Sequence, residues 1–474
     1  MKPVAVSGVE DGLEKGNGLP LAMQIYTRIR GEIVSGRLPG GASLPSTREL
    51  AQDLGVSRGR ILEAYEILGA EGFIESRQGA PSRVRKGLAF SEDTPAGVAA
   101  KEIPKPCADE RQRIRYDFRT GVPALGAFPL SAWLSSLTQC RGIDSRELGY
   151  TGPEGCSPLR AEIAGWLYRT KGMPIAADDV FVTAGSTHCF NVLADILRGG
   201  GNGGKGVFAL ETPCHPGMRG ILARRGIPVA EMEVDELGAR PQTVAGWDVA
   251  AYYVTPSHQF PLGWVMAAER RIELARCARE RNAYIVEDDY DGEFRYRGHP
   301  IPPLHSYDGE RVIYAGTFSK TLYPACRLGF AVLPRSLREA WRTARHLADM
   351  QNPILEQLAM ADFMRSGRLS RHISKMRRLY ARRRKTLVAA AALYFGERGT
   401  ILGDASGLHV ALSVRGGFFG EAFYREALER GVRAYPLEMY TPSGGRHTDK
   451  ILLGYGNIDE AGIVHGLKIL AGLT

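Results

Sequence analysis

Short apolar runs recur through the C-terminal part of this chain, and each ends in small or polar residues. The runs are DDVFVTAG, KGVFALE, WDVAAYYVTP, NAYIVEDDY and RVIYAGTFS. They are rich in β-branched and aromatic residues, and helical segments separate them, as expected for buried parallel strands joined by helices. Residues 116–474 therefore predict an α/β domain with a mainly parallel sheet.

The segment before residue 87 has a different, compact helical pattern. LAMQIYTRIRGEIVSG spaces its isoleucines four residues apart, which favours a helix with one apolar face. LPSTRELAQDLGV predicts a second helix, with Ser46 as N-cap and Glu49 completing a capping box. SRGRILEAYEILGAEGF predicts a third helix capped by Ser57, and FIESRQGAPSRVRK predicts two short strands around a turn.

At 474 residues the chain is too long for one ordinary domain. Residues 87–115 are rich in Ala, Pro and charge and have little periodicity, which is typical of a linker. We therefore expect a flexible leader at 1–18, a small helical domain at 19–86, the linker at 87–115 and the α/β domain at 116–474.

Composition limits the compartment and the partners. Seven cysteines are scattered without a CxxC pair, which indicates reduced thiols and argues against disulfides or structural zinc. No apolar run reaches the roughly 20 residues of a membrane-spanning helix, and the N-terminus lacks a secretory signal. We expect a cytoplasmic protein with no membrane partner, whose net charge of +9 is compatible with nucleic acid.

Two helices joined around LGVS and followed by a hairpin predict a winged helix-turn-helix. The third helix begins SRGR, so its N-terminus offers backbone N–H groups, a hydroxyl and two guanidinium groups to DNA. The alternative is a helical bundle whose arginines form a solvated face. The candidate DNA-binding residues are Ser46, Arg48, Ser57, Arg58 and Arg60, with Arg77, Arg83 and Arg85 on or after the wing.

The stretch GRLPGGASLPSTRELAQDLGVSRGRILEAYEILGAEGFIESRQG closely resembles the GntR-type winged helix domain, and the resemblance covers residues 19–85. It implies operator DNA as a partner. Two departures concern which operator is recognised: Gly59 and Arg60 replace more usual small polar residues, and the wing reads GAPSRV.

The segment GTFSKTLYPACRLGF carries the residues with the most chemistry. The Lys320 amine suits a Schiff base with an aldehyde cofactor, and Arg327 suits bidentate phosphate binding. In FVTAGSTHCFNVLADIL, a turn with Gly185, Ser186 and Thr187 precedes a helix, whose N-terminus favours phosphate. We expect these groups to meet at strand ends, where open α/β sheets bind ligands.

The run AYIVEDDYDGEF places Asp288 and Asp289 at the end of another predicted strand. A carboxylate there can keep a pyridine nitrogen protonated, and the Tyr290 hydroxyl can reach a ring oxygen. A metal site or a solvated strand end are the alternatives. Because no histidine neighbours the acids in the sequence, we expect no metal.

Residues 116–474 resemble a fold-type-I, pyridoxal-phosphate-dependent aminotransferase, and behind a GntR-type domain they resemble the MocR family of bacterial regulators. The matching motifs are YTGPEGCSPLR, VTAGSTHCFNVL, ALETPCHPG, VTPSHQFPLGWVM, IVEDDYDGEF and GTFSKTLYPACRLGF. The resemblance implies that Lys320, as the catalytic residue, binds pyridoxal 5'-phosphate covalently, with Asp288 at the pyridine nitrogen and Tyr290 at the 3'-oxygen. It further implies phosphate binding by Ser186, Thr187, Thr317, Ser319 and Arg327.

In the same resemblance, Tyr150 reaches the phosphate of a neighbouring subunit, which implies a homodimer with shared sites and a domain-swapped arrangement. His215 stands where a ring-stacking aromatic is usual. Phe260 in HQFPLG replaces the polar residue at the ring oxygen, for which His258 or Gln259 are the candidate substitutes.

The largest departure is Leu452 in KILLGYG, where aminotransferases carry an arginine that clamps the substrate carboxylate. Losing that clamp costs substrate positioning. Another arginine could bind the substrate carboxylate from a different direction, and the candidates are Arg219, Arg433 and Arg446. The alternative is that all three are ordinary charged surface residues. Another basic run, SRHISKMRRLYARRRKTL, predicts an amphipathic helix with a solvated basic face, and a DNA-backbone contact is the alternative.

We therefore expect a transcription regulator that senses pyridoxal phosphate or its adduct with an amine. Because the carboxylate arginine is missing, the cofactor itself is the favoured effector, which points to control of vitamin B6 metabolism. The alternatives are a regulator of amine or amino-acid use (GABA, taurine or ectoine derivatives), a working aminotransferase with a DNA-binding appendage, and a constitutive DNA-binding protein.

Overall fold

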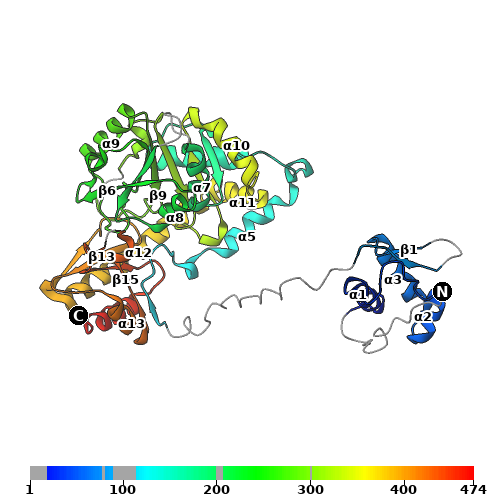
Figure 1. Cartoon of the computed structure of the whole chain (residues 1–474). Coiled ribbons are helices and arrows are strands. Elements are labelled where there is room, and N and C mark those ends of the chain that lie inside the picture. Colours follow the sequence, from blue (N-terminus) through cyan, green and yellow to red (C-terminus); the bar gives the residue numbers. More distant parts are fainter. Residues whose placement is uncertain (1–18, 77–80, 89–113, 199–205, 299–300, 443) are drawn as a thin grey trace. The chain divides into compact units, whose positions relative to one another are not determined.

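The computed structural model describes residues 19–76, 81–88, 114–198, 206–298, 301–442 and 444–474. The chain divides into two compact units, Met1–Pro106 and Cys107–Thr474 (Figure 1). In the described ranges, every helix is too short or too polar to cross a bilayer.

The first unit is a winged helix-turn-helix. It contains α1 (Leu21–Val34), α2 (Thr47–Asp53), α3 (Arg58–Ala70) and an antiparallel pair, β1 (Ile74–Glu75) with β2 (Arg83–Val84). The isoleucines of α1 are buried against α3, as their spacing predicts. The capping box is confirmed, because the Ser46 hydroxyl accepts from the Glu49 N–H at 3.2 Å and the Glu49 carboxylate accepts from the Ser46 N–H at 2.9 Å. Ser57 occupies the N-cap of α3 but makes no side-chain capping bond.

The larger sheet of the second unit has the strand order β4-β11-β10-β9-β8-β5-β6-β7. The five apolar runs form mutually parallel strands, which confirms the predicted sheet, and β6 extends it in the same direction. The edge strand β7 and the inserted strand β11 run antiparallel. The strands are β4 (Val180–Thr183), β5 (Val207–Thr212), β6 (Val229–Asp235), β7 (Gly238–Ala239), β8 (Val249–Val254), β9 (Tyr284–Asp289), β10 (Val312–Thr317) and β11 (Gly329–Val332).

Helices cover both faces of this sheet (Figure 1). Alternate residues of β5 belong to different apolar clusters: Phe208 and Leu210 pack with α7, α8 and α10, whereas Val207 and Ala209 pack with α9. This is the arrangement that continuous apolar strands require. These helices and those beside them are α5 (Leu130–Thr138), α6 (Ser157–Lys171), α7 (Ser186–Leu197), α8 (Pro216–Arg224), α9 (Ala268–Glu280), α10 (Arg338–Ala348) and α11 (Ile354–Arg365).

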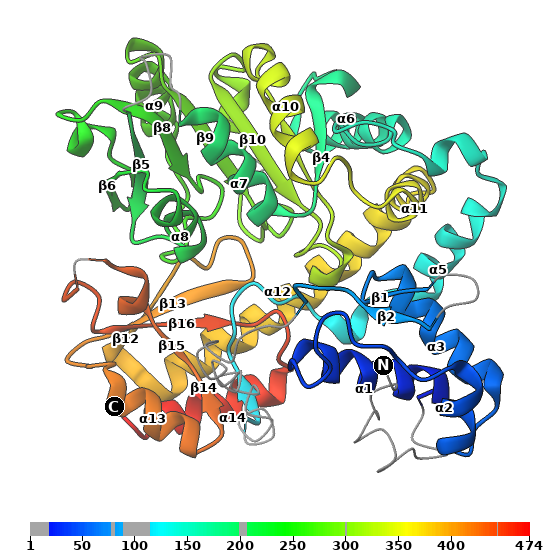
Figure 2. The same ribbon diagram turned by 45° about the vertical axis from the view of Figure 1, so that its right-hand side comes forward.

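A smaller sheet, ordered β12-β13-β16-β15, packs beside the long helix α12 (Arg368–Phe395) (Figure 2). A short pair, β14 with β3, adjoins it. The remaining elements are β3 (Tyr116–Asp117), β12 (Gly399–Leu402), β13 (His409–Val414), α13 (Glu421–Glu429), β14 (Val432–Arg433), β15 (Tyr435–Pro436), β16 (Lys450–Gly454) and α14 (Glu460–Ala471).

Helix α12 is amphipathic as predicted, with Ile373 and Met376 buried. Most lysines and arginines of the predicted run are exposed, in agreement with the expected solvated face, whereas two are not. Arg383 and Arg384 are partly buried and bond to loop carbonyls of the smaller sheet region, Arg384 also to Asp404. These guanidinium groups stabilise the packing of α12 on the smaller sheet.

Candidate functional site

A cavity of about 290 Å³ lies at the C-terminal ends of β8 and β9 and the N-terminus of α7. Of the residues expected to hold a cofactor, the fold brings Ser186, Thr187, His215, Asp288, Tyr290 and Lys320 to its lining. Sequence motifs did not single out Thr120, Gly121, Tyr253, Thr255 or His409, which line it too. A strand-end cavity with convergent polar groups is a typical ligand site of an α/β sheet.

Lys320 follows β10 and points at the N-terminal segment of the unit. Its Nζ donates to the Gly121 carbonyl at 2.7 Å. Gly121 has φ +70°, a conformation that favours glycine, and a Cβ there would lie 2.8 Å from Nζ, so a side chain would displace the amine. Burial lowers the pKa of Lys320, against the opposing effect of Asp291 and Asp288. A desolvated lysine with a lowered pKa is suited to attack an aldehyde.

This lowered pKa gives a pH prediction. The reaction of Lys320 with an aldehyde is expected to accelerate with rising pH and to level off below the ordinary lysine pKa of 10.5, because the reacting species is the neutral amine. Below its folded-state pKa the amine is protonated and unreactive. Stopped-flow absorbance from neutral to alkaline pH measures the rate, and a rate that still rises through 10.5 contradicts the assignment.

Asp288 is the second-last residue of β9 and lines the cavity together with Lys320. Its Oδ2 accepts from the Tyr253 hydroxyl at 2.7 Å, whereas its Oδ1 is buried and has no hydrogen-bond partner among the described residues. Burial raises the pKa of Asp288 to about 7, although Tyr253 and Lys320 counteract it. An unpartnered buried carboxylate oxygen fits a protonated ring nitrogen, which would stabilise the charged carboxylate.

Tyr290 also lines the cavity. Its hydroxyl donates to the His258 carbonyl at 2.8 Å and lies 3.1 Å from His258 Nδ1. That Nδ1 also contacts both Asp291 carboxylate oxygens, at 3.1 and 3.2 Å. This histidine pairs with Asp291, which is not one of the two acids, Asp288 and Asp289, that the sequence singled out. His258, Asp291 and His409 gather with ligand atoms within 4.8 Å, but the Asp291 contact already engages His258 Nδ1.

Ser186 and Thr187 begin α7 and line the cavity, whereas the other residues expected at a phosphate do not line it. Gly185, at φ +87°, is the N-cap, and the Arg327 guanidinium hydrogen-bonds the preceding Ala184 carbonyl. Arg327 itself has φ +47°, an uncommon conformation for a non-glycine residue that turns its side chain to this helix terminus. The backbone N–H of Ser319 donates to Thr317 Oγ1 at 3.2 Å. A guanidinium, hydroxyls and a helix N-terminus together suit a phosphate dianion.

His215 caps α8 at the mouth of the cavity, where its Nδ1 accepts from the Gly217 N–H at 3.0 Å. Its ring centroid lies 5.4 Å from that of Phe260. Desolvation lowers the pKa of His215, and the positive charge of Lys320 adds to the effect. A neutral imidazole at this position is able to stack on a pyridine ring.

Leu452 is fully buried, in an apolar cluster with Phe260 and Ala411. The position of the expected carboxylate clamp is therefore filled by packed hydrocarbon. None of the candidate replacement arginines lines the cavity, and each pairs with a carboxylate: Arg219 with Glu231 at 2.6 Å, Arg433 with Asp117 at 3.4 Å and Arg446 with Glu233 at 3.1 Å.

Tyr150 is 82% exposed, and its expected contact with a neighbouring subunit stays a prediction. In the first unit, Ser46, Arg48, Ser57, Arg58 and Arg60 are all exposed on α2, α3 and their caps. Arg58 Nε donates to Thr47 Oγ1 at 3.3 Å, and Arg60 pairs with Glu63 at 3.1 Å. Arg77 lies outside the described residues.

A winged helix-turn-helix and an aminotransferase-like unit on one chain define a class of DNA-binding regulator. Residues 21–84 match the family model described as bacterial regulatory proteins, gntR family. The chain is 32% identical to the probable rhizopine catabolism regulatory protein MocR of Rhizobium meliloti, over 97% of this chain and 94% of the relative. The chain belongs to the MocR-type family of transcription regulators.

Two further comparisons extend the likeness. The chain is 31% identical to the HTH-type pyridoxine biosynthesis transcriptional regulator PdxR of Corynebacterium glutamicum, over 76% of each chain. The α-aminoadipate aminotransferase LysN from Thermus thermophilus aligns with a TM-score of 0.68 and 24% identity, over 77% of this chain and 92% of that one. The structural likeness establishes the fold-type-I aminotransferase architecture.

Proposed function

We propose that this protein is an operator-binding regulator whose aminotransferase-like domain binds pyridoxal phosphate through Lys320 and senses it, or its adduct with an amine. One observation carries the proposal: groups suited to the cofactor converge in one cavity, whereas Leu452 occupies the place of the substrate clamp. Such a site retains the ligand but lacks the contact that positions a substrate for turnover.

In this proposal each residue has a defined task. Lys320 attaches the cofactor aldehyde, and Asp288 holds the pyridine nitrogen protonated. His215 stacks on the ring, Tyr290 approaches its oxygen, and Arg327 with Gly185, Ser186, Thr187, Thr317 and Ser319 binds the phosphate. The bound cofactor would supply an electron-withdrawing pyridinium ring.

The domain plan belongs to the same proposal. It comprises a leader at 1–18, a DNA-binding domain at 19–86, a linker at 87–115 and the cofactor domain at 116–474, in a cytoplasmic homodimer. In that dimer, Tyr150 completes the partner's phosphate site in a domain-swapped arrangement. A ligand shifts operator affinity when it favours one arrangement of the domains over another.

Pyridoxal phosphate itself is the proposed effector, with vitamin B6 metabolism as the controlled process, and the similarity to PdxR supports this choice. A DNA-shift titration on the region upstream of the protein's own gene tests it. The cofactor is expected to move the midpoint by about tenfold, within the usual range of allosteric coupling. Pyridoxine 5'-phosphate, which lacks the aldehyde, is the matched control, and equal midpoints with and without pyridoxal phosphate would refute the proposal.

The second candidate is control of amine or amino-acid use, which the similarity to the rhizopine catabolism regulator favours. It is supported if operator affinity changes only when an amino compound is added to cofactor-loaded protein. Steady transamination of an amino donor with 2-oxoglutarate would instead support a working aminotransferase.

A further inference from the structure

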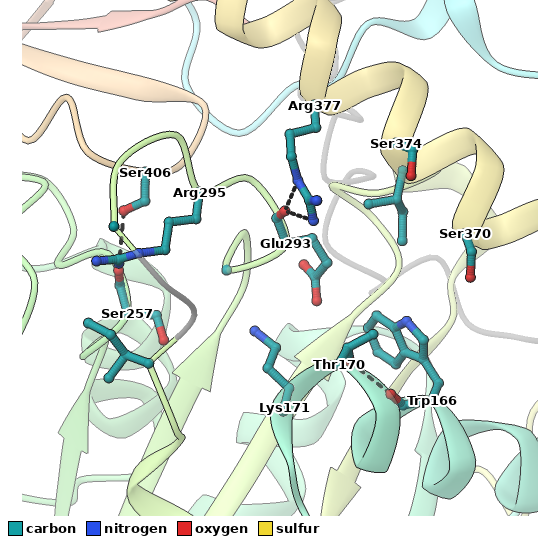
Figure 3. Close-up of a pocket in the computed structure, with 14 residues that line it drawn as sticks. Trp166, Thr170, Lys171, Ser257, Glu293, Arg295, Ser370, Ser374, Arg377 and Ser406 are labelled. Carbon is teal, nitrogen blue, oxygen red and sulfur yellow. Dashed lines mark hydrogen bonds between the residues drawn. The ribbon is translucent and has the colours of Figure 1, made fainter.

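A second cavity of about 400 Å³ lies between α6, the loop after β9 and α12 (Figure 3). The cofactor residues named above do not line it. Its lining combines Trp166 and Ile373 with charged groups and with the hydroxyls of Ser257, Ser370, Ser374 and Ser406. The volume falls within the roughly 300–1,000 Å³ of small-molecule sites.

The cavity contains a carboxyl group without a cation of its own. The Glu293 side chain points into it on the side of Lys171 (Figure 3). Lys171, however, donates to Asp289 at 2.7 Å. In the described part of the chain, Glu293 makes no side-chain ion pair, and burial raises its pKa to about 7, against the attraction of the nearby Lys171. A partly buried carboxyl without an ion pair would gain from a cationic ligand.

The same cavity holds arginines without anions. Arg295 has no carboxylate partner among the described residues, its Nε is buried and unbonded, and burial lowers its pKa. Arg377 on α12 donates to the Glu293 backbone carbonyl at 2.9 and 3.1 Å and has no carboxylate partner in the same ranges. Both guanidinium groups have capacity left for a carboxylate.

We propose that this cavity binds an amino acid as a zwitterion, with its ammonium at Glu293 and its carboxylate at Arg295 and Arg377. A simple anion would leave Glu293 without an ion pair, and a simple amine would leave both arginines without one. An amino acid satisfies both charges at once. This deepens the proposed function, on which its regulatory meaning rests, by giving the amino compound a site separate from Lys320.

The two cavities share walls. Asp288 lines the cofactor cavity, while the next residue, Asp289, binds Lys171 of the second cavity. Ser257 lines the second cavity, and the adjacent His258 bonds Tyr290 of the first. Because neighbouring backbone atoms hold both sites, occupancy of one biases the geometry of the other, and the coupling is reciprocal.

Calorimetry on the full-length Lys320→Ala variant without pyridoxal phosphate tests the site independently of cofactor attachment. The probes are glycine, β-alanine, 4-aminobutanoate and 5-aminopentanoate, in which the distance between the charges increases, with butanoate and butylamine as single-charge controls. We expect one member of the series to bind at least about tenfold more tightly than either control. Absence of binding across the series, or equal binding of a control, would overturn the proposal.

Variants then locate the bound probe. Arg295→Met and Glu293→Gln, the latter nearly isosteric, are each expected to weaken binding by about tenfold or more. Arg378→Met is the matched control, since Arg378 is exposed on α12 beside Arg377 and does not line the cavity. Binding that Arg295→Met and Glu293→Gln leave unchanged assigns the probe to another site and refutes the inference.

Discussion

Lys320→Ala is expected to abolish the absorbance band of the lysine-bound cofactor and to remove the response of operator binding to pyridoxal phosphate. The Lys320 amine combines a lowered pKa with a position next to Asp288 and Gly121. Without the amine, only contacts to the phosphate and the ring hold the cofactor. We expect cofactor binding to weaken by at least about tenfold, which is the cost of losing a single buried charged contact.

Lys385→Ala is the matched control, because Lys385 is exposed on α12 and should leave both properties intact. DNA binding without ligand should be equal in the two variants, since neither residue belongs to the first unit. If Lys320→Ala loses the cofactor yet its operator binding still responds normally, covalent sensing is wrong. The same measurement therefore separates cofactor binding from signalling.

The sequence predicts those features of the molecule that depend on residues close to one another in the chain. The capping box of Ser46 and Glu49 lies within one turn, so residue spacing alone predicts it. The five parallel strands follow from continuous apolar runs. Lys320, Asp288 and the turn at Gly185 could be placed together, because parallel strands end at the same edge of a sheet.

Contacts made by distant segments could not be predicted in this way. Gly121 lies 199 positions from Lys320, yet its carbonyl accepts from the lysine. His409 lines the cavity from the smaller sheet, and nothing in the strand patterns relates the two sheets. The segment GTFSKTLYPACRLGF does not reveal the antiparallel strand β11, because only its last two residues belong to the strand that pairs with β10 and β4.

The second cavity illustrates the same limit for charge. Glu293 and Arg295 stand in a polar run that suggests solvated side chains, and Arg377 lies in an apparently ordinary basic helix. Only the packing of α6 and α12 around the β9 loop desolvates the first two groups, and their altered pKa values follow from that burial. The sequence shows which residues are charged, but only the fold shows that they line the same cavity.

The other large effect is expected in the DNA-binding unit. The double variant Arg48→Ala, Arg58→Ala should weaken operator binding by at least about 30-fold, since each arginine contact with a base contributes roughly 1–3 kcal/mol. Both side chains are exposed, on α2 and at the start of α3, and Thr47 Oγ1 orients the Arg58 guanidinium. Fluorescence anisotropy at several salt concentrations measures the affinity and its salt dependence.

Arg60→Ala serves as the comparison within the same helix. Glu63 already neutralises Arg60 through an exposed 3.1 Å pair, so its removal should cost less than that of Arg48 or Arg58. Cofactor absorbance should be unchanged in all these variants, because they leave the second unit intact. An equal loss for Arg60→Ala would mean that DNA displaces Glu63, and an unaffected double variant would show that α2 and α3 do not form the DNA-binding surface.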